Sequence, residues 1–236
     1  MTTHWLAIDT ATDLASVAVS TPDRMVTQSI RGARQHAAQI VPLIHEVLST
    51  AHLSLEQIRG IVVGDGPGSF TGLRIGWAAA KGLIQQRRVP MLAIPSLLGA
   101  AHAARVNAVA ACYDALRGQV FGAIYAFATD SLETLVAPEL FTIAQLAAAF
   151  ARPPDLAVGD GAERYRAEVL AWTGKEPLGL DALPPVAASL LTLARYDGAG
   201  RALDDAGVAE PVYGRPAEAQ VKWEIRHGRP LPNSSR

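Results

Sequence analysis

The sequence predicts an α/β fold that is duplicated along the chain, with two mixed β-sheets and helices packed on them. From Ile61 to Ile94 a strand, a helix and a second strand follow one another, and a crossover of that length implies a parallel strand pair. Val63-Gly64-Asp65-Gly66 recurs as Val158-Gly159-Asp160-Gly161, 95 residues later. A strand that ends in aspartate also recurs, at Asp9 and at Asp114, 105 residues apart. Because both landmarks repeat in the same order, we expect two copies of one unit.

The first unit is expected to begin with short strands and to continue with alternating helices and strands. Turn-forming residues separate the opening strands, which favours an antiparallel meander. Apolar residues at helical spacing then alternate with short apolar runs. In chain order we expect strands over Trp5–Asp9, Leu14–Ser20 and Met25–Ile30, a helix over His36–Ala51, a strand over Ile61–Gly64, a helix over Ser69–Gln85 and a strand over Met91–Ile94.

The second unit repeats the opening of the first. Val106–Asp114 is predicted to be a strand, and a turn at Leu116-Arg117-Gly118 leads to a second strand over Gln119–Phe127. After Val212 the chain becomes polar and basic, which predicts a solvated tail or an arm that contacts RNA. We therefore expect a first lobe over residues 1–104, a second, degenerate lobe over 105–211, and a basic tail over 212–236 that carries Arg215, Lys222, Arg226 and Arg229.

The composition is that of a globular protein in a reducing compartment. Of its 236 residues, 50% are hydrophobic and 18% are charged, so the chain can bury a substantial core. A net charge of −1 gives no overall attraction to nucleic acid or membranes. The single cysteine, Cys112, excludes an internal disulfide.

The hydropathy pattern predicts neither a membrane protein nor a secreted one. No lysine or arginine precedes Arg24, and Asp9 interrupts the first apolar run, which argues against a signal peptide. The longest weakly polar run, Met91–Ala104, is too short to span a bilayer. We therefore expect a cytoplasmic protein with no contact to membranes.

Two helices carry more apolar surface than one sheet face needs. In the second predicted helix the apolar side chains form one seam, with Gly72 and Gly76 beside it. Each glycine costs about 1 kcal/mol relative to alanine, so the pair indicates close approach of another backbone. In the first helix, which Pro42 is expected to kink, the apolar arc covers about 160°. Both helices are therefore either well covered within the chain or a docking face for another subunit. The docking candidates are Ile40, Val41, Ile44, Leu48, Phe70, Leu73 and Trp77, with Arg74 as a polar contact at the rim.

A few polar residues near strand ends are candidates for a vestigial nucleotide site. Asp9, Thr10 and Asp114 follow or end strands that are expected to face a cleft, where aspartates can hold a metal–phosphate or activate a hydroxyl. Aspartates at such positions also form turns, and both interpretations stay open. The segment Asp9–Asp13 lacks the glycine that a phosphate-binding hairpin needs, which disfavours tight nucleotide binding.

The remaining motifs assign no catalytic residue and no metal ligand. The glycine-rich turn at Gly66–Gly76 has neither the lysine of a P-loop nor a G-x-G-x-x-G pattern. No H-E-x-x-H occurs, and Ser69 lacks the context of a nucleophile elbow. The sequence combines an enzyme-like fold with few catalytic candidates.

Segments spread along the chain carry a family resemblance. Ala7–Thr12 is AIDTAT, Gln35–Ile44 is QHAAQIVPLI and Gly66–Gly76 is GPGSFTGLRIG, a highly specific signature. Together they resemble the TsaB family, also called YeaZ. The likeness continues through Tyr113–Val120, the second Val-Gly-Asp-Gly and Glu210–Tyr213, and so covers nearly the whole chain.

The resemblance implies the duplicated fold of actin, Hsp70 and sugar kinases (ASKHA) and a role without catalysis of its own. TsaB is a subunit of the bacterial machinery that makes threonylcarbamoyladenosine in tRNA, beside the anticodon. The resemblance implies that the first two long helices pair with a TsaD-type catalytic subunit, joined by a TsaE-type ATPase. ATP would be used by the complex, tRNA would be met through it, and no cofactor is assigned to this chain. A homodimer through the same helices is the alternative for the free protein.

The related catalytic subunit TsaD, once called a glycoprotease, binds metal through a His-x-x-x-His motif. Aligned without gaps from Gly66-Pro67-Gly68, this chain has Leu98 and His102 at the two histidine positions. One imidazole does not make an iron or zinc site. Two alternatives remain: a stand-alone ATP-binding kinase or ATPase that uses Asp9 and Asp114, and a metallopeptidase, which the missing histidine disfavours.

Overall fold

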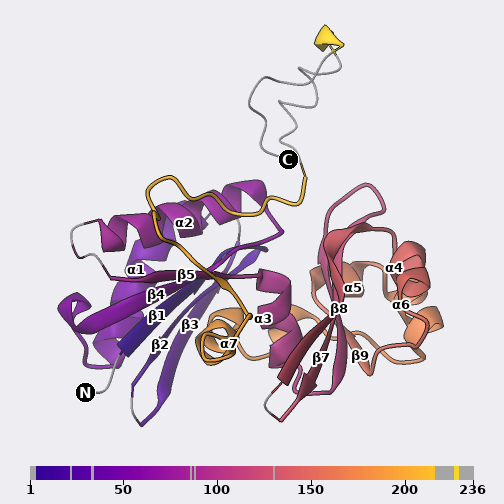
Figure 1. Ribbon diagram of the computed structural model, residues 1–236, viewed down its shortest axis with the longest axis horizontal. Coiled ribbons are helices and arrows are strands. Elements are labelled where there is room, and N and C mark those ends of the chain that lie inside the picture. Colours follow the sequence, from indigo (N-terminus) through magenta and orange to yellow (C-terminus); the bar gives the residue numbers. More distant parts are fainter. Residues whose placement is uncertain are drawn as a thin grey trace.

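The computed structural model contains two β-sheets with helices packed on and between them (Figure 1). It describes residues 4–21, 23–32, 35–85, 87, 89–129, 131–215 and 226–228. Both sheets contain parallel and antiparallel neighbours, which confirms the predicted α/β class with two mixed sheets.

The first sheet has the strand order β10-β5-β4-β1-β2-β3. The predicted antiparallel meander forms its β1, β2 and β3 edge, while β1, β4 and β5 are parallel. The last strand, β10, pairs antiparallel with β5. The bounds are His4–Asp9 for β1, Leu14–Ser20 for β2, Met25–Arg31 for β3, Ile58–Gly64 for β4, Met91–Ile94 for β5 and Arg201–Ala202 for β10.

Alternation along β1 sends its side chains into two separate cores. Leu6 and Ile8 pack with the apolar faces of α1 (His36–Thr50) and α2 (Phe70–Ile84) on the outer face of the sheet. Ala7, on the opposite face, joins the core beneath α3 (Ser96–Ala103) and α7 (Val186–Leu193). The helix α1 runs through Pro42 without interruption. The helices α3 and α7 pack against each other between the two sheets, as Figure 1 shows.

The second sheet has the order β8-β7-β6-β9, with β6 parallel to β9 and antiparallel to β7. Three helices cover its outer face through a core that includes Ile124, Leu146 and Val169. The bounds are Ala108–Asp114 for β6, Val120–Ala128 for β7, Ser131–Phe141 for β8, Ile143–Ala149 for α4, Leu156–Val158 for β9, Asp160–Arg164 for α5 and Arg166–Thr173 for α6. Two short 3-10 helices, η1 (Leu55–Gln57) and η2 (Leu180–Ala182), complete the fold.

The sequence repeats fall at equivalent places in the two sheets. Asp9 and Asp114 end β1 and β6, each of which has one antiparallel and one parallel neighbour. Val63-Gly64-Asp65-Gly66 spans the end of β4, and Val158-Gly159-Asp160-Gly161 spans the end of β9, the two parallel neighbours. The units differ afterwards, because β4 leads to the 15-residue α2 and β9 to the five-residue α5.

The chain returns to the first sheet near its end. The helix α7 packs on β1, β2 and β4, and β10 extends the same sheet, although both lie within the expected second lobe over 105–211. The division at 1–104, 105–211 and 212–236 thus stays a prediction. Of the basic tail, Arg215 and Arg226 are described, while Lys222 and Arg229 lie outside the described residues. No helix formed by the described residues is long and apolar enough to cross a membrane.

Candidate functional site

The glycine-rich turn begins α2 against the turn that follows β1. The Ser69 side chain accepts a hydrogen bond from the Gly72 N–H at 3.2 Å, the interaction of an N-cap residue. The Ser69 N–H donates to the Ala11 carbonyl at 2.7 Å. The start of α2 is therefore joined to the β1–β2 turn by backbone contact.

The backbone that approaches the glycine face of α2 belongs to this chain. A Cβ at Gly72 would lie 2.1 Å from the Thr10 carbonyl oxygen, and one at Gly76 would lie 2.3 Å from Thr10 Oγ1. At Gly68 a Cβ would lie 2.3 Å from the carbonyl of Ala11. The Thr10 hydroxyl donates to the Gly72 carbonyl at 2.7 Å. The close approach predicted from Gly72 and Gly76 thus occurs within the monomer.

Asp9 lies in the core instead of facing a cleft. It is 1% exposed, and Ser96 Oγ donates a hydrogen bond to its Oδ1 at 2.5 Å. A Cβ at Gly64 would lie 2.1 Å from the same oxygen, so β4 passes directly against the carboxyl group. Burial raises the pKa of Asp9 to about 6, against the opposing effect of hydrogen bonds from Ser96 and the Ala11 backbone. Asp9 and Thr10 are thus both buried, and each makes a hydrogen bond within the chain.

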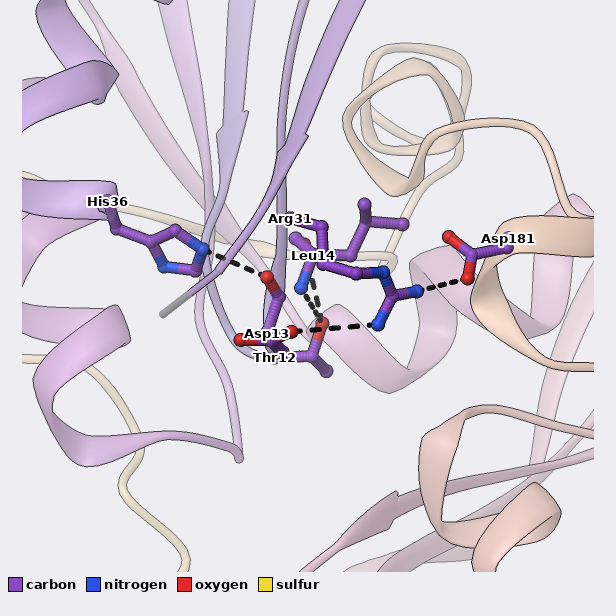
Figure 2. Close-up of polar contacts among 6 residues, drawn as sticks. All are labelled: Thr12, Asp13, Leu14, Arg31, His36 and Asp181. Atoms are coloured by element: carbon purple, nitrogen blue, oxygen red, sulfur yellow. Dashed lines mark hydrogen bonds and ion pairs between the residues drawn. The ribbon is translucent and has the colours of Figure 1, made fainter. Parts of the chain in front are cut away.

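Polar contacts hold the rest of the β1–β2 turn (Figure 2). The Asp13 carbonyl accepts a hydrogen bond from His36 Nε2 at 3.1 Å, and the Asp13 carboxylate lies 3.6 Å from the Arg31 guanidinium. The same guanidinium donates to Asp181 in η2, and this contact lowers the pKa of the Asp181 carboxyl. Arg31 therefore ties the turn to a segment that follows the second sheet.

A cleft of about 550 Å³ lies between the β1–β2 turn, the start of α2 and the end of β6. Its lining comprises Ala11, Thr12, Asp13, Gly68, Ser69, Phe70, Tyr113, Asp114, Ala115, Leu116, Phe121, Asp160, Tyr213 and Arg215. Of the three predicted nucleotide-site residues, only Asp114 lines it.

The Asp114 carboxylate is paired with Arg164 at 3.1 Å. Asp160 Oδ1 accepts the N–H groups of Asp114 and Gly161, at 3.1 and 3.0 Å. Burial, aided by the charge of Asp114, raises the pKa of Asp160.

Five of the eight predicted docking residues are part of the monomer core. Ile40, Ile44 and Leu48 of α1 and Trp77 of α2 belong to the core on the outer face of the first sheet. Leu73 of α2 belongs to the core beneath α3 and α7. Trp77 Nε1 also donates to the Gly64 carbonyl at 3.1 Å. These side chains support the helices from inside, and none of them presents a free surface.

The other three docking candidates are exposed, and Tyr213, to which the sequence assigned no role, lies beside Phe70. Val41 is 65% exposed on α1, and Phe70 is 39% exposed at the start of α2. The Arg74 guanidinium lies 5.4 Å from the centre of the Phe70 ring. The centres of the Phe70 and Tyr213 rings are 4.5 Å apart. We call Phe70, Arg74 and Tyr213 the aromatic patch. Because Phe70 and Tyr213 also line the cleft, the patch forms part of its rim.

An ion pair brings Tyr213 to α2. Arg201 donates to both carboxylate oxygens of Asp65, at 2.8 and 2.9 Å, and to the Glu210 carbonyl at 2.7 Å. The Val212 N–H donates to the Asp65 carbonyl at 2.8 Å. These hydrogen bonds hold segment 201–213 against α2, and the orange trace in Figure 1 shows it passing over this helix. No periodicity in the sequence indicates this contact, since 143 positions separate Phe70 from Tyr213.

The described residues include no group of three or more His, Cys, Asp and Glu side chains that could hold a metal ion. Leu98 is buried, and His102 lines a different cavity from the cleft. The arrangement around the cleft is therefore one of internal hydrogen bonds and an exposed aromatic rim.

Comparisons with known proteins agree on one family. The family model "TsaD: tRNA N6-adenosine threonylcarbamoyltransferase" matches residues 27–168. TsaB of Haemophilus influenzae, a tRNA threonylcarbamoyladenosine biosynthesis protein, is 30% identical over 95% of this chain and 97% of its own length. TsaB of Escherichia coli is 39% identical, over 51% of this chain and 54% of its own. The alignment thus spans only about half of that relative.

Solved structures give the same answer for the fold. The YeaZ structure from Pseudomonas aeruginosa matches with a TM-score of 0.72 and 28% identity, covering 89% of this chain and all of that one. YeaZ has the ASKHA-like fold, so the expected fold family is confirmed.

Proposed function

The chain belongs to the TsaB (YeaZ) family of tRNA threonylcarbamoyladenosine biosynthesis proteins, and we propose that it serves there as a non-catalytic subunit that binds and activates a TsaD-type threonylcarbamoyltransferase. A TsaE-type ATPase and tRNA would join through the same cytoplasmic complex. ATP would be consumed by the complex and not by this chain.

The burial of Asp9 and Thr10, which the sequence placed in a vestigial nucleotide site, supports a role without catalysis. A group that moves protons or holds phosphate must reach the reacting atoms. Asp9 is enclosed with its Ser96 hydrogen bond, and the Thr10 hydroxyl is bound to the Gly72 carbonyl. These internal contacts use the groups that a kinase or ATPase of this fold would direct at its nucleotide.

The single observation that carries the partner role is the exposed aromatic patch beside α1. Aromatic and arginine side chains dominate the binding energy of protein interfaces. Phe70 is exposed although it contacts both Arg74 and Tyr213, and α1, with the exposed Val41, packs against α2. We propose that the TsaD-type subunit covers Phe70, Arg74 and Val41, while the buried docking candidates keep the two helices rigid.

Reconstitution tests the role of the chain. The cognate TsaD, TsaE and adenylate-forming synthase are incubated with ATP, bicarbonate, threonine and unmodified tRNA, with and without this protein, and nucleosides are read by mass spectrometry. Threonylcarbamoyladenosine that forms only in its presence supports the accessory role. Equal product in its absence rejects that role.

Surface variants test the interface. Phe70→Ala combined with Arg74→Glu should weaken binding to TsaD at least tenfold in calorimetry and reduce product accordingly, because interface hot spots are worth about 2 kcal/mol or more. Arg59→Glu is the matched control, an exposed arginine on β4 outside the patch. Circular dichroism melting should show each variant folded. Full affinity in the double variant would place the partner elsewhere.

A further inference from the structure

A second cavity, of about 870 Å³, lies at the end of the second sheet opposite the cleft. Ala108, at the start of β6, lines this cavity, whereas Asp114, at the end of the same strand, lines the cleft. A strand of seven residues separates the two by about 20 Å. The cavity is therefore distinct from the candidate site described above, and its volume falls in the range of small-molecule sites, about 300–1,000 Å³.

Aromatic rings from three parts of the chain form one wall of this cavity. The His102 ring, near the end of α3, makes edge-to-face contacts with Phe127 of β7, at 5.6 Å between centroids, and with Tyr196 after α7, at 6.4 Å. Phe150, which follows α4, also lines the cavity. The three contacting rings are each half-buried. Their mutual packing holds a preformed apolar wall to which a planar ligand can bind.

Two arginine side chains at this cavity have no partner within the described chain. Arg105 and Arg152 both line the cavity and both are exposed, and neither guanidinium makes a hydrogen bond or ion pair with another described residue. Burial, aided by the charge of Arg105, lowers the pKa of His102, which favours the neutral imidazole. The positive charge therefore comes from the guanidinium groups, which suit phosphate through paired N–H donors.

Two acidic residues, Asp155 and Glu133, also line the cavity, so the guanidinium groups offer phosphate a local positive charge and not a net positive cavity. Asp155 accepts the Ala108 N–H at Oδ2, at 2.9 Å, and its carbonyl accepts Lys175 Nζ at 2.9 Å. Glu133 is exposed, and its carboxylate has no partner among the described residues. A lone carboxylate beside two guanidinium groups can accept hydrogen bonds from amino or hydroxyl groups of the same ligand.

We propose that this cavity binds a nucleotide, with its base on the His102, Phe127 and Tyr196 rings and its phosphate on Arg105 and Arg152. Stacking of bases on aromatic rings and contact of phosphate with arginine are the two interactions by which proteins hold nucleotides without reading their sequence. The ligand is a free mononucleotide or one nucleotide of an RNA strand. The proposal does not depend on the partner role above.

Titration of the full chain with AMP tests this site. Binding is measured by calorimetry and by NMR signals of the His102 ring. AMP should shift those signals, and adenosine or inorganic phosphate alone should bind at least tenfold more weakly. Arg105→Ala combined with Arg152→Ala should lower AMP affinity at least tenfold, whereas Arg59→Ala should leave it unchanged. A short single-stranded RNA that binds more tightly than AMP, and loses affinity in the same variant, identifies the strand as the source.

Three results would overturn the proposal. AMP at millimolar concentration that leaves the His102 signals unchanged would do so. Unchanged affinity in the folded double arginine variant would do so as well. Perturbation confined to Phe70 and Tyr213 would assign the nucleotide to the cleft instead.

Discussion

At the scale of single residues, Asp9 shows how a conspicuous carboxylate can have a structural role. Its position at the end of β1 is the one expected from the sequence, but the adjacent glycine of β4 and the Ser96 hydroxyl enclose it. Its second oxygen, Oδ2, is buried with no described partner. The group therefore influences the stability of the fold.

The pKa of Asp9 predicts a pH dependence of stability. Because the folded pKa of about 6 exceeds the ordinary value of 3.8, the native state binds this proton more tightly than the unfolded chain does. The free energy of unfolding should therefore fall as pH rises from about 4 to 6, by about 3 kcal/mol from this group. Urea unfolding between pH 4 and 7.5 measures it.

Asp9→Asn should remove most of that decline, because the amide does not titrate. A smaller slope of the same sign should remain from Asp160, whose pKa is also raised by burial. The exposed Asp23→Asn serves as the control and should keep the wild-type slope. A full decline in Asp9→Asn would show that other groups cause the pH dependence.

Two aromatic residues on α2 should respond in opposite ways to truncation. Trp77→Ala should lower the free energy of unfolding by about 3–5 kcal/mol, because the indole is buried and donates to the Gly64 carbonyl. Phe70→Ala should cost only about 1 kcal/mol, the value of one aromatic contact at a partly exposed site. Urea denaturation of both variants separates them, and equal losses would contradict the assignment of Phe70 to the surface.

At the scale of elements, the fit of α2 on the β1–β2 turn depends on two glycines, which have no side chain at the point of contact. Gly72 and Gly76 face Thr10, while at Gly82, six residues beyond Gly76 in the same helix, an added methyl group would meet no atom within 4 Å. Glycine is therefore needed for close packing at the start of this helix, whereas no such contact requires it at Gly82.

Alanine substitutions along α2 test this fit. Gly72→Ala should destabilise the protein by about 1–3 kcal/mol, since its methyl group would meet the Thr10 carbonyl. Gly82→Ala is the matched control and should stabilise it by up to about 1 kcal/mol through helix propensity alone. Thermal melts of the two variants give the comparison. Stabilisation by both substitutions would mean that the turn moves away from α2 without cost.

At the scale of the whole molecule, one ion pair connects the late part of the chain to the first sheet. Asp65 is buried at the end of β4, and Arg201 reaches it from β10 while also holding the Glu210 carbonyl. Lys81 of α2 donates to the Gly207 carbonyl at 3.1 Å. These contacts place segment 201–213 across α2 and complete the aromatic patch.

Arg201→Ala should loosen this segment and leave the two sheets folded. The loss of the partner of Asp65 should cost about 1–3 kcal/mol. Hydrogen exchange followed by mass spectrometry should show faster exchange over residues 203–213 and unchanged exchange over β6 and β7. Arg166→Ala, which breaks an exposed pair with Glu176, is the control and should alter neither region. Uniformly faster exchange would contradict a local role.

Periodicity predicted most strands and both long helices of the first sheet, and also β6 and β7, within one or two residues, but the strand expected at Ile61 begins at Ile58. The strands β2 and β5 have the expected bounds, and β1, β3, α1 and α2 differ from expectation by one residue at one or both ends. The helices α3 and α7 were not predicted, because they are buried between the sheets and are apolar on most sides, so they lack the one-sided pattern that marks a surface helix. The strand β8 was also not predicted, because its exposed and half-buried residues do not alternate regularly.

The sequence by itself determined the α/β class, the duplication and the family, since these rest on local patterns and on ordered motifs such as GPGSFTGLRIG. Only the tertiary structure decided which apolar residues are core and which are surface. A helical seam defines a face, but the neighbour that covers it can come from anywhere in the chain. Thr10 covers the glycines of α2, and Tyr213 reaches Phe70 through a segment that Asp65, Arg201 and Lys81 hold against α2. The exposed patch therefore depends on contacts between residues far apart in sequence.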